Sequence, residues 1–341
     1  MKLKIHTYIS TLFVLLAGCA NAMSKNQTAF EWVASESATD LYPTKIVQGI
    51  FHYRGSEMGV FIPSGGTYEG EWGEFISTHV GGNDVRELPD RMSILYYSLA
   101  EKQFYKGTFN LPYDKILTLF REGVAADKKR PWFRRIMVGT APGGAVAVWV
   151  TGSRTKEVFF GQAEKYDLRY GQAIGVKFKD AADEAEFTDG LLSDILKPEQ
   201  IAAIKRDGIP FGKWARFRNL YRWNLTAAGE INLSIEREDI PVTFINGEYL
   251  EVGRLLSEEF GRAQSPLPRN ITLGVIKNDL PYPYVLHFDE FEIMEAFEKL
   301  GANGELVHLE VTPAVTREAT RVRAYNDKEP IPLKKTRVAD I

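Results

Sequence analysis

The spacing of apolar residues changes twice along the chain, each time from strands to a helix and back to strands. Runs rich in β-branched and aromatic residues, such as Ile46–Phe51 and Phe104–Phe109, predict the first strands. Over Leu111–Gly123 the apolar residues recur at helical spacing, and Gly123 is expected to end that helix. Residues 135–141 and 145–151 then predict a hairpin with a Pro-Gly-Gly turn.

The second half follows the same order. Its predicted strands are 220–225, 231–235, 242–245, 271–276, 306–311 and 320–325. Between them, Phe288–Leu300 predicts a helix in which Asp289 and Glu292 match a capping box. We therefore predict an α+β fold of two β-rich modules, each a mainly antiparallel sheet with one packed helix. A true duplication and a chance recurrence of the same order both fit this pattern.

An acidic segment with helical spacing joins the two modules. Pro198 suits the start of a helix there and Gly208 its end, which indicates a short helical bridge rather than a loose linker. The predicted organisation is a signal peptide at 1–18, a flexible tether at 19–28, a first module at 29–180, the bridge at 181–212 and a second module at 213–341.

The first residues have the layout of a bacterial lipoprotein signal. Lys2 and Lys4 precede an apolar stretch that is shorter than the roughly 20 residues needed to span a bilayer. The stretch ends in Leu-Ala-Gly-Cys at positions 16–19, which resembles the lipobox, whose thiol accepts the lipid. We predict lipidation at Cys19; the alternative is an ordinary cleavage site with a chance cysteine. Ala20, where Asp would favour retention, indicates the outer membrane, with the protein facing the periplasm.

The cysteine count and the net charge exclude several kinds of site and partner. Cys19 is the only cysteine, so the mature chain has no disulfide, no thiolate nucleophile and no cysteine zinc site. Removing the signal, which holds two lysines and no acid, changes the formal charge from −3 to −5. This mild charge and the lack of a basic stripe with interleaved aromatics argue against nucleic acid as a partner.

Catalytic motifs are absent from the sequence. There is no nucleophile elbow, P-loop, zinc-protease motif or dinucleotide fingerprint. Residues 139–144 suit a hairpin turn better than a phosphate cradle, because the lysine of a P-loop is missing. His52 and His308 lie in strand patterns and are expected to be structural or surface residues rather than ligands. We therefore expect a protein that is not an enzyme and binds neither a cofactor nor a metal.

One glycine-rich segment, Ser64–Glu74, is typical of a recognition loop. Tyr68, Glu69, Glu71 and Trp72 give it aromatic and acidic side chains, which suit binding to another protein. We therefore take these four as candidate partner-binding residues. The equally acceptable alternative is that Tyr68 and Trp72 fold back onto the sheet.

Several of these features together resemble one protein family. The stretch Phe109–Gly123, followed by Val138–Gly144 and Val148-Trp149, is similar to the core of the family called domain of unknown function 2931. That resemblance carries no catalytic residues. It implies a lipoprotein, and a likeness to immunity proteins paired with phospholipase effectors of type VI secretion systems.

The resemblance therefore suggests a toxic lipase effector as the partner, with the membrane contacted through the N-terminal lipid. A tethered inhibitor would reach a high effective concentration near the toxin's target. The competing hypotheses are a housekeeping envelope lipoprotein with a scaffolding or assembly role, and a hydrolase with an unrecognised carboxylate site.

The lipobox gives a direct test. Mass spectrometry of the N-terminal peptide of the mature protein should show an acylated Cys19, and Cys19→Ser should abolish both the acylation and membrane association, because the thiol is the acceptor. An unmodified N-terminal peptide in the wild-type protein would contradict the lipoprotein prediction.

Overall fold

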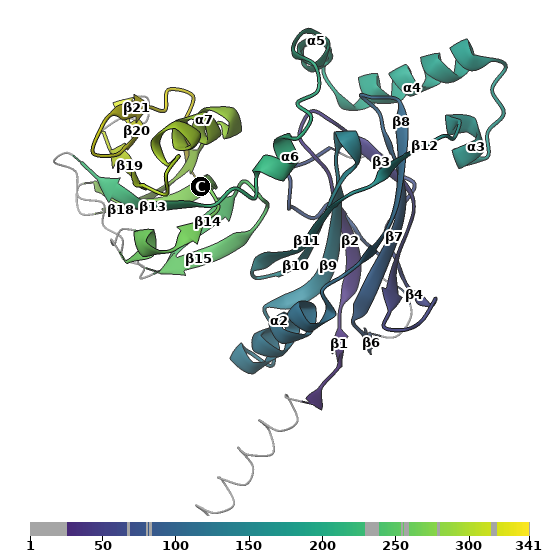
Figure 1. The fold of residues 1–341 in the computed structure, drawn as a ribbon, viewed down its shortest axis with the longest axis horizontal. Helices are drawn as coiled ribbons and strands as arrows, with labels where there is room; N and C mark the ends of the chain where they lie inside the picture. Colours follow the sequence, from purple (N-terminus) through teal and green to yellow (C-terminus); the bar gives the residue numbers. More distant parts are fainter. Residues whose placement is uncertain are drawn as a thin grey trace, which may run out of the picture. The chain divides into compact units, whose positions relative to one another are not determined.

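The computed structural model describes residues 26–66, 69–79, 81, 84–228, 239–253, 255, 259–277, 280–314 and 319–340. The chain divides into two compact units, one ending at Ile209 and the other beginning at Pro210. Figure 1 shows the helices and strands of both. The predicted α+β class with mainly antiparallel pairing is confirmed, but each unit contains two main sheets rather than one. The strand predicted at 231–235 lies outside the described residues.

Two five-stranded arrangements make up the first unit. One has the order β11 (Thr155–Gln162), β10 (Ala145–Gly152), β9 (Phe133–Thr140), β2 (Val33–Ser37) and β5 (Thr78–His79). The other has the order β12 (Glu164–Tyr166), β8 (Gln103–Asn110), β7 (Pro89–Ser98), β3 (Thr44–Tyr53) and β4 (Gly59–Phe61). A short separate pair joins β1 (Ala29–Glu31) to β6 (Val85–Glu87). Among these neighbours only β2 and β9 run parallel.

The core of the first unit lies between its two sheets. Met92 of β7 and Val148 of β10 belong to one buried cluster, which also contains Ile116 and Phe120 of helix α2 (Tyr113–Ala126). The helix therefore adds its predicted apolar stripe to the same core that the two sheets form. The predicted hairpin is also confirmed, since β9 and β10 pair antiparallel across the short 3-10 turn η1 (Pro142–Gly144).

The prediction that Gly123 ends α2 is wrong, because the helix continues to Ala126. Gly123 is buried on the inward face instead. A Cβ at this position would lie 3.1 Å from the backbone nitrogen of Trp132 and 3.2 Å from the Phe133 ring. The glycine therefore allows a close approach between the helix and the start of β9.

The segment predicted as a bridge packs with the first unit. It forms α4 (Ala181–Ile195) and α5 (Pro198–Asp207), preceded by α3 (Tyr170–Ile174). Apolar residues of α4, including Leu191 and Ile195, pack against a buried aromatic cluster that includes Tyr97 and Phe104. These helices thus cover one end of the outer face of the sheet formed by β8, β7 and β3 (Figure 1).

The second unit begins with the short helix α6 (Lys213–Arg216) and again contains two sheets. One has the order β22 (Arg337–Asp340), β18 (Leu280–His287), β17 (Pro268–Lys277), β14 (Asp239–Phe244) and β15 (Tyr249–Gly253). The other has the order β16 (Gln264–Ser265), β13 (Tyr221–Ala227), β19 (Leu306–Thr312), β20 (Arg321–Tyr325) and β21 (Pro330–Pro332). The short 3-10 turn η2 (Phe260–Arg262) precedes β16, and helix α7 (Glu290–Leu300) precedes β19.

The second unit repeats the first strand by strand. In each unit the opening strand, β2 or β13, pairs parallel with the strand that follows the helix, β9 or β19. The order β4-β3-β7-β8-β12 in the first unit corresponds to β15-β14-β17-β18-β22 in the second, with the same place of each strand along the chain. The short strands β5 and β16 occupy the same edge position beside the opening strand.

Equivalent side chains make the same contact in both units. The Trp32 indole donates a hydrogen bond to the carbonyl of Glu87, and the Trp223 indole donates one to the carbonyl of Pro266. The donor–acceptor distance is 3.1 Å in both cases. In both cases the next residue is a fully buried leucine, followed by the proline that opens β7 or β17. Shared topology and a shared buried contact favour an internal duplication over a chance recurrence.

Helix α7 has half of the predicted capping box. The Asp289 carboxylate accepts a hydrogen bond from the backbone N–H of Glu292 at 2.9 Å, as an N-cap does. The Glu292 carboxylate does not return to the cap. It accepts hydrogen bonds from the backbone N–H groups of Lys334 and Lys335, each at 2.9 Å, and so attaches a distant loop to the helix.

The repeated indole contact should contribute similarly to both units. Trp32→Phe and Trp223→Phe each leave a carbonyl without its donor, so each should lower the stability of its own unit by roughly 1–3 kcal/mol. Hydrogen exchange read by mass spectrometry should show faster exchange confined to the unit that carries the substitution. A change in only one of the two variants would contradict the equivalence.

Candidate functional site

The residues selected from the sequence fall in different environments. Cys19 and Tyr68 lie outside the described residues. Glu69 and Glu71 are exposed on the segment that precedes β5. No helix among the described residues is long and apolar enough to cross a bilayer. The same part of the chain contains no group of three or more His, Cys, Asp or Glu side chains placed to hold a metal ion.

Trp72 is buried, not presented to a partner. Only 3% of its surface is exposed, and its ring meets Trp149 edge-on with centroids 5.0 Å apart. Both rings lie over Gly139 of β9, where a Cβ would be 2.6 Å from Trp149 and 3.1 Å from Trp72. Of the two readings of Trp72, the structure supports the one in which the side chain folds back onto the sheet, and Trp72 is withdrawn as a partner-binding residue. The large apolar surface of the indole gains more from packing on the sheet than from solvent.

The segment around Trp72 is held onto β2 by hydrogen bonds. The backbone N–H of Gly73 donates to the Ser37 hydroxyl at 3.1 Å, and that of Ile76 donates to the Glu36 carbonyl at 2.9 Å. The Ser35 hydroxyl donates to the carbonyl of Ser77. The segment is consequently a cover for the outer face of the β2–β9–β10 sheet, and Glu69 and Glu71 form its solvent side.

Glu36 is a carboxyl group on the core-facing side of β2. It is 1% exposed, and its Oε1 accepts a 2.5 Å hydrogen bond from the Ser77 hydroxyl, while Oε2 has no partner in the described structure. Burial raises the pKa of Glu36, because the charged form loses its hydration, and the Ser77 hydrogen bond only partly opposes this effect.

The Pro142–Gly144 turn is already occupied by protein groups. The Gly143 N–H donates to the Glu101 carboxylate at 2.8 Å, and the other oxygen of Glu101 accepts from the Tyr105 hydroxyl at 2.7 Å. A carboxylate in this position would repel an anion. The structure therefore agrees with a plain hairpin turn and not with a phosphate cradle.

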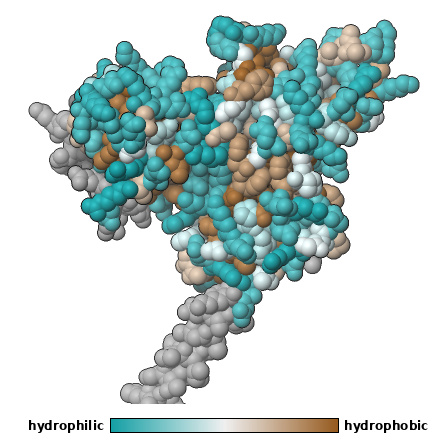
Figure 2. All heavy atoms as spheres, viewed as in Figure 1, coloured by the Kyte–Doolittle hydropathy of each residue, from teal (hydrophilic) through white to brown (hydrophobic). Residues whose placement is uncertain are grey.

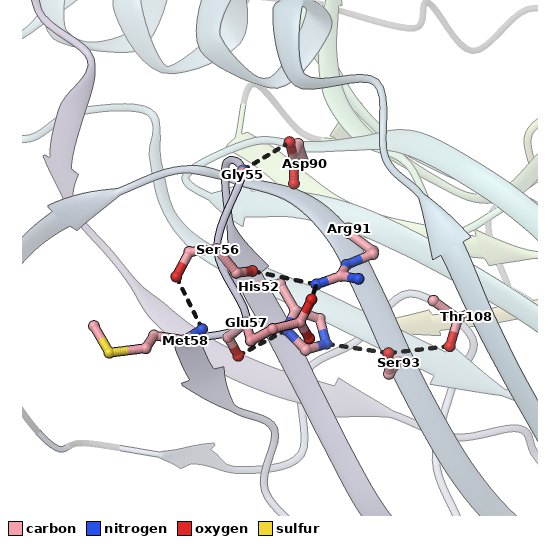
Figure 3. Close-up of polar contacts among 9 residues, drawn as sticks. All are labelled: His52, Gly55, Ser56, Glu57, Met58, Asp90, Arg91, Ser93 and Thr108. Carbon is pink, nitrogen blue, oxygen red and sulfur yellow. Dashed lines mark hydrogen bonds and ion pairs between the residues drawn. The ribbon is translucent and has the colours of Figure 1, made fainter.

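A row of polar side chains crosses the outer face of the other sheet, and sequence reasoning alone did not find it. His52 of β3 lies 3.1 Å from the Ser93 hydroxyl of β7, which lies 3.1 Å from the Thr108 hydroxyl of β8 (Figure 3). The other ring nitrogen of His52 is 3.1 Å from the Glu57 carbonyl. These residues are far apart in the sequence, and only the strand order β8-β7-β3 brings them together.

The contacts of His52 determine its tautomer. A carbonyl oxygen only accepts hydrogen bonds, so Nδ1 must donate to Glu57, which leaves Nε2 of the neutral ring as an acceptor. The Ser93 hydroxyl then donates to Nε2, and the Thr108 hydroxyl donates to Ser93. Such a serine–histidine pair would also be the first requirement of a hydrolase.

The surroundings of Ser93 do not suit acyl transfer. Strand β7 is paired on both sides, with β3 and with β8, so the peptide N–H groups near Ser93 are used in the sheet. An oxyanion would need donors of this kind that are free to bind it. We therefore interpret the row as a rigid polar ladder that fixes the surface rather than as a catalytic dyad.

Two exposed apolar side chains lie at the edge of the sheet, near the His52 end of this ladder. Met58 is 71% exposed and Phe61 60% exposed, at and beside the edge strand β4. Nearby, Arg91 makes a 2.7 Å ion pair with Glu57 and also donates to the Ser56 carbonyl (Figure 3). The hydrogen bond from Arg91 lowers the pKa of Glu57, so this pair stays charged at neutral pH.

We define the docking surface as Met58 and Phe61 together with Arg91, Ser93 and Thr108. It combines exposed apolar groups with polar groups held in fixed positions, which is the composition of protein recognition sites. In the sequence, a methionine and a phenylalanine near a predicted strand gave no signal, because the alternation of a strand does not reveal which strand lies at an edge.

Comparison with known proteins identifies a family but no characterised relative. The family described as "Protein of unknown function (DUF2931)" matches residues 19–212. No curated protein and no solved structure shows significant similarity to the chain. The matched range covers the described part of the first unit and extends just past its end.

Glu36 provides a test of the buried carboxyl. Because its pKa is raised in the folded state, wild-type stability from this group is highest below the unfolded pKa and falls as the pH rises through the folded pKa. Glu36→Gln removes the charge and retains an acceptor for Ser77. The difference in melting temperature, variant minus wild type, should therefore become more positive as the pH rises from 4 to 7. Glu71→Gln, on the exposed side of the same segment, should show no such trend, and a flat difference for Glu36→Gln would contradict the assignment.

Proposed function

Since the chain belongs to the DUF2931 family, a family of proteins of unknown function, we propose that it is a membrane-tethered periplasmic lipoprotein that binds and inhibits a type VI secretion phospholipase effector. It acts as a stoichiometric immunity protein and not as an enzyme. The lipobox at residues 16–19 supports the tether, and the resemblance to immunity proteins supports the class of partner.

The observation that carries the proposal is the exposure of Met58 and Phe61 beside the rigid polar ladder. Exposed apolar groups within a polar rim favour association with another protein, because burying them removes apolar surface from water. Fixing the surrounding polar groups in advance reduces the entropy lost on binding. Methionine adds a flexible side chain that adapts to the partner.

The chemistry of this surface suits a lipase. An enzyme that takes a phospholipid from a bilayer must present apolar surface around its active-site entrance. Met58 and Phe61 can cover such a surface, while Arg91 and Glu57 supply charged groups for the rim. Binding there would block substrate entry without any chemical step by the inhibitor.

The position of the chain start fits a tethered inhibitor. Nine residues lie between Cys19 and Ala29, where the first strand begins, so this tether of ten steps spans at most about 35 Å when fully extended. Strands β1 and β4 lie toward the end of the first unit opposite α3 and α4 (Figure 1). The docking surface would thus stay close to the membrane that a phospholipase attacks.

Co-purification tests this proposal. The full mature chain should form a one-to-one complex with a phospholipase effector encoded beside it and should abolish lipase activity at equimolar ratio. The double variant Met58→Ser with Phe61→Ser should weaken binding by at least about tenfold, because it removes the apolar contact.

The matched control is Val176→Ser, which changes another exposed apolar residue of the same unit and should leave inhibition intact. Unchanged inhibition by the Met58/Phe61 variant would contradict the docking surface. Failure of the wild-type protein to bind any neighbouring lipase would contradict the immunity function and favour a scaffolding role in the envelope.

A further inference from the structure

The second unit contains a pocket of about 1070 Å³ on the outer side of its β19–β20–β21 strands. Glu310 and Thr312 of β19 and Arg321 and Arg323 of β20 form one wall. The other wall is formed by Pro332, Leu333, Lys334, Thr336, Arg337 and Val338. The size is at the upper end of pockets that hold small molecules. All of these lining residues lie within the second unit, beyond the range that the family model matches.

The pocket lining is strongly basic. Its charged residues are Arg321, Arg323, Lys334, Arg337 and Glu310. Glu310, the only carboxylate among the described lining residues, is bound to Arg323 through two hydrogen bonds of 2.7 and 3.1 Å. No ion pair is found for Lys334 or Arg337 in the described structure, so their charges are available to a ligand.

The basic wall is held in place before any ligand binds. The Arg323 guanidinium lies over the Tyr325 ring at 5.2 Å, and Tyr325 stacks on His308 at 4.9 Å. His308 in turn hydrogen-bonds Asn224 at 2.7 Å. The opposite wall is fixed by the Glu292 carboxylate, which holds the backbone of the Lys334 loop.

A buried hydroxyl in the pocket lining has no hydrogen-bond partner. Thr336 Oγ1 is shielded from solvent and unbonded within the described structure. The hydroxyl of Thr226 is also buried and without a hydrogen-bond partner in the described structure. Thr226 lies opposite Glu310 in the pairing of β13 with β19. Buried polar groups are normally satisfied, and an unpaired one costs free energy that a ligand acceptor at Thr336 would recover.

The strand-by-strand correspondence shows that this face differs between the units. In the first unit the equivalent outer face of the β2–β9–β10 sheet is covered by Trp72 and Trp149. In the second unit the same face carries charged and polar side chains, and the visible surface of that unit is mainly hydrophilic (Figure 2). The basic pocket is thus a feature of the second copy and not a requirement of the fold.

We propose that the second unit binds a phosphate group carried on an apolar body, in the pocket formed by Lys334, Arg337 and Thr336. Guanidinium and ammonium groups bind phosphate oxygens through charge-assisted hydrogen bonds, and the hydroxyl adds a neutral donor. Val322, Leu333 and Val338 in the lining provide apolar surface next to the charges. This site is independent of the proposed lipase docking surface in the first unit.

Titration calorimetry of the full mature chain in a non-ionic detergent tests the site. The probes are dihexanoyl phosphatidic acid, inorganic phosphate and the zwitterionic dihexanoyl phosphatidylcholine. The phosphatidic acid should bind, and the double variant Lys334→Gln with Arg337→Gln should weaken it by at least about tenfold, because two charged contacts are lost.

Lys335→Gln is the matched control, since Lys335 neighbours the pocket residue Lys334 but does not line the pocket. Its affinity should match wild type, and all variants should keep the wild-type melting temperature because these side chains are exposed. Inorganic phosphate bound as tightly as phosphatidic acid would assign a free phosphate as the ligand, and preference for phosphatidic acid would assign a lipid headgroup. Equal binding of phosphatidylcholine, equal weakening by Lys335→Gln or no binding of either phosphate probe would overturn the proposal.

Discussion

In each unit a buried tryptophan indole donates a hydrogen bond from one sheet to the chain entering the other. The arrangement of the rest of the structure depends on this contact between the two sheets. Trp32 lies just before β2 in one sheet, and its acceptor Glu87 lies two residues before β7 in the other. In the second unit Trp223 lies within β13, and its acceptor Pro266 lies two residues before β17. The contact links the opening strand of one sheet to the chain that enters the other, where the two inner faces meet. Once those faces are buried against each other, only the outer faces are available to other molecules.

The outer faces of the first unit are used in three ways. Helices α3 and α4 cover one end of the β8–β7–β3 face, and the segment around Trp72 covers the β2–β9–β10 face. The remaining area carries the His52 ladder with Met58 and Phe61 at its edge. A rigid ladder beneath exposed apolar groups favours recognition, because neither the backbone nor the polar groups must reorganise when a partner binds.

The two units share their inner faces and differ on their outer faces, where packing between the sheets sets no constraint. The inner faces keep the same elements, and α7 repeats the buried stripe of α2. The outer face that holds Trp149 in the first unit holds the Arg323–Glu310 pair in the second. The proposed docking surface and the proposed phosphate pocket can therefore be tested separately, since each depends on residues of a different unit.

Local patterns in the sequence are sufficient to predict the helices, most of the strands and the class of fold. The apolar stripe of α2, the hairpin of β9 and β10 and the Asp289 cap all follow from local spacing and turn chemistry. The sequence also supplied the family resemblance, through the helix and the turn that follows it. These features act over a few residues, so the chain alone carries them.

Which side chains form the surfaces depends on contacts between segments that are far apart in the sequence. A tryptophan in a glycine-rich stretch can be exposed to solvent or buried in the core. Trp72 is buried because Gly139 has no side chain, which leaves space for the indole to pack on the sheet. His52 meets Ser93 because of the strand order, which local patterns do not encode. Glu292 matched a local cap, but two free backbone N–H groups from a distant loop offered it better partners. Contacts between remote segments depend on how sheets pair and face each other, and that choice is made by the whole chain.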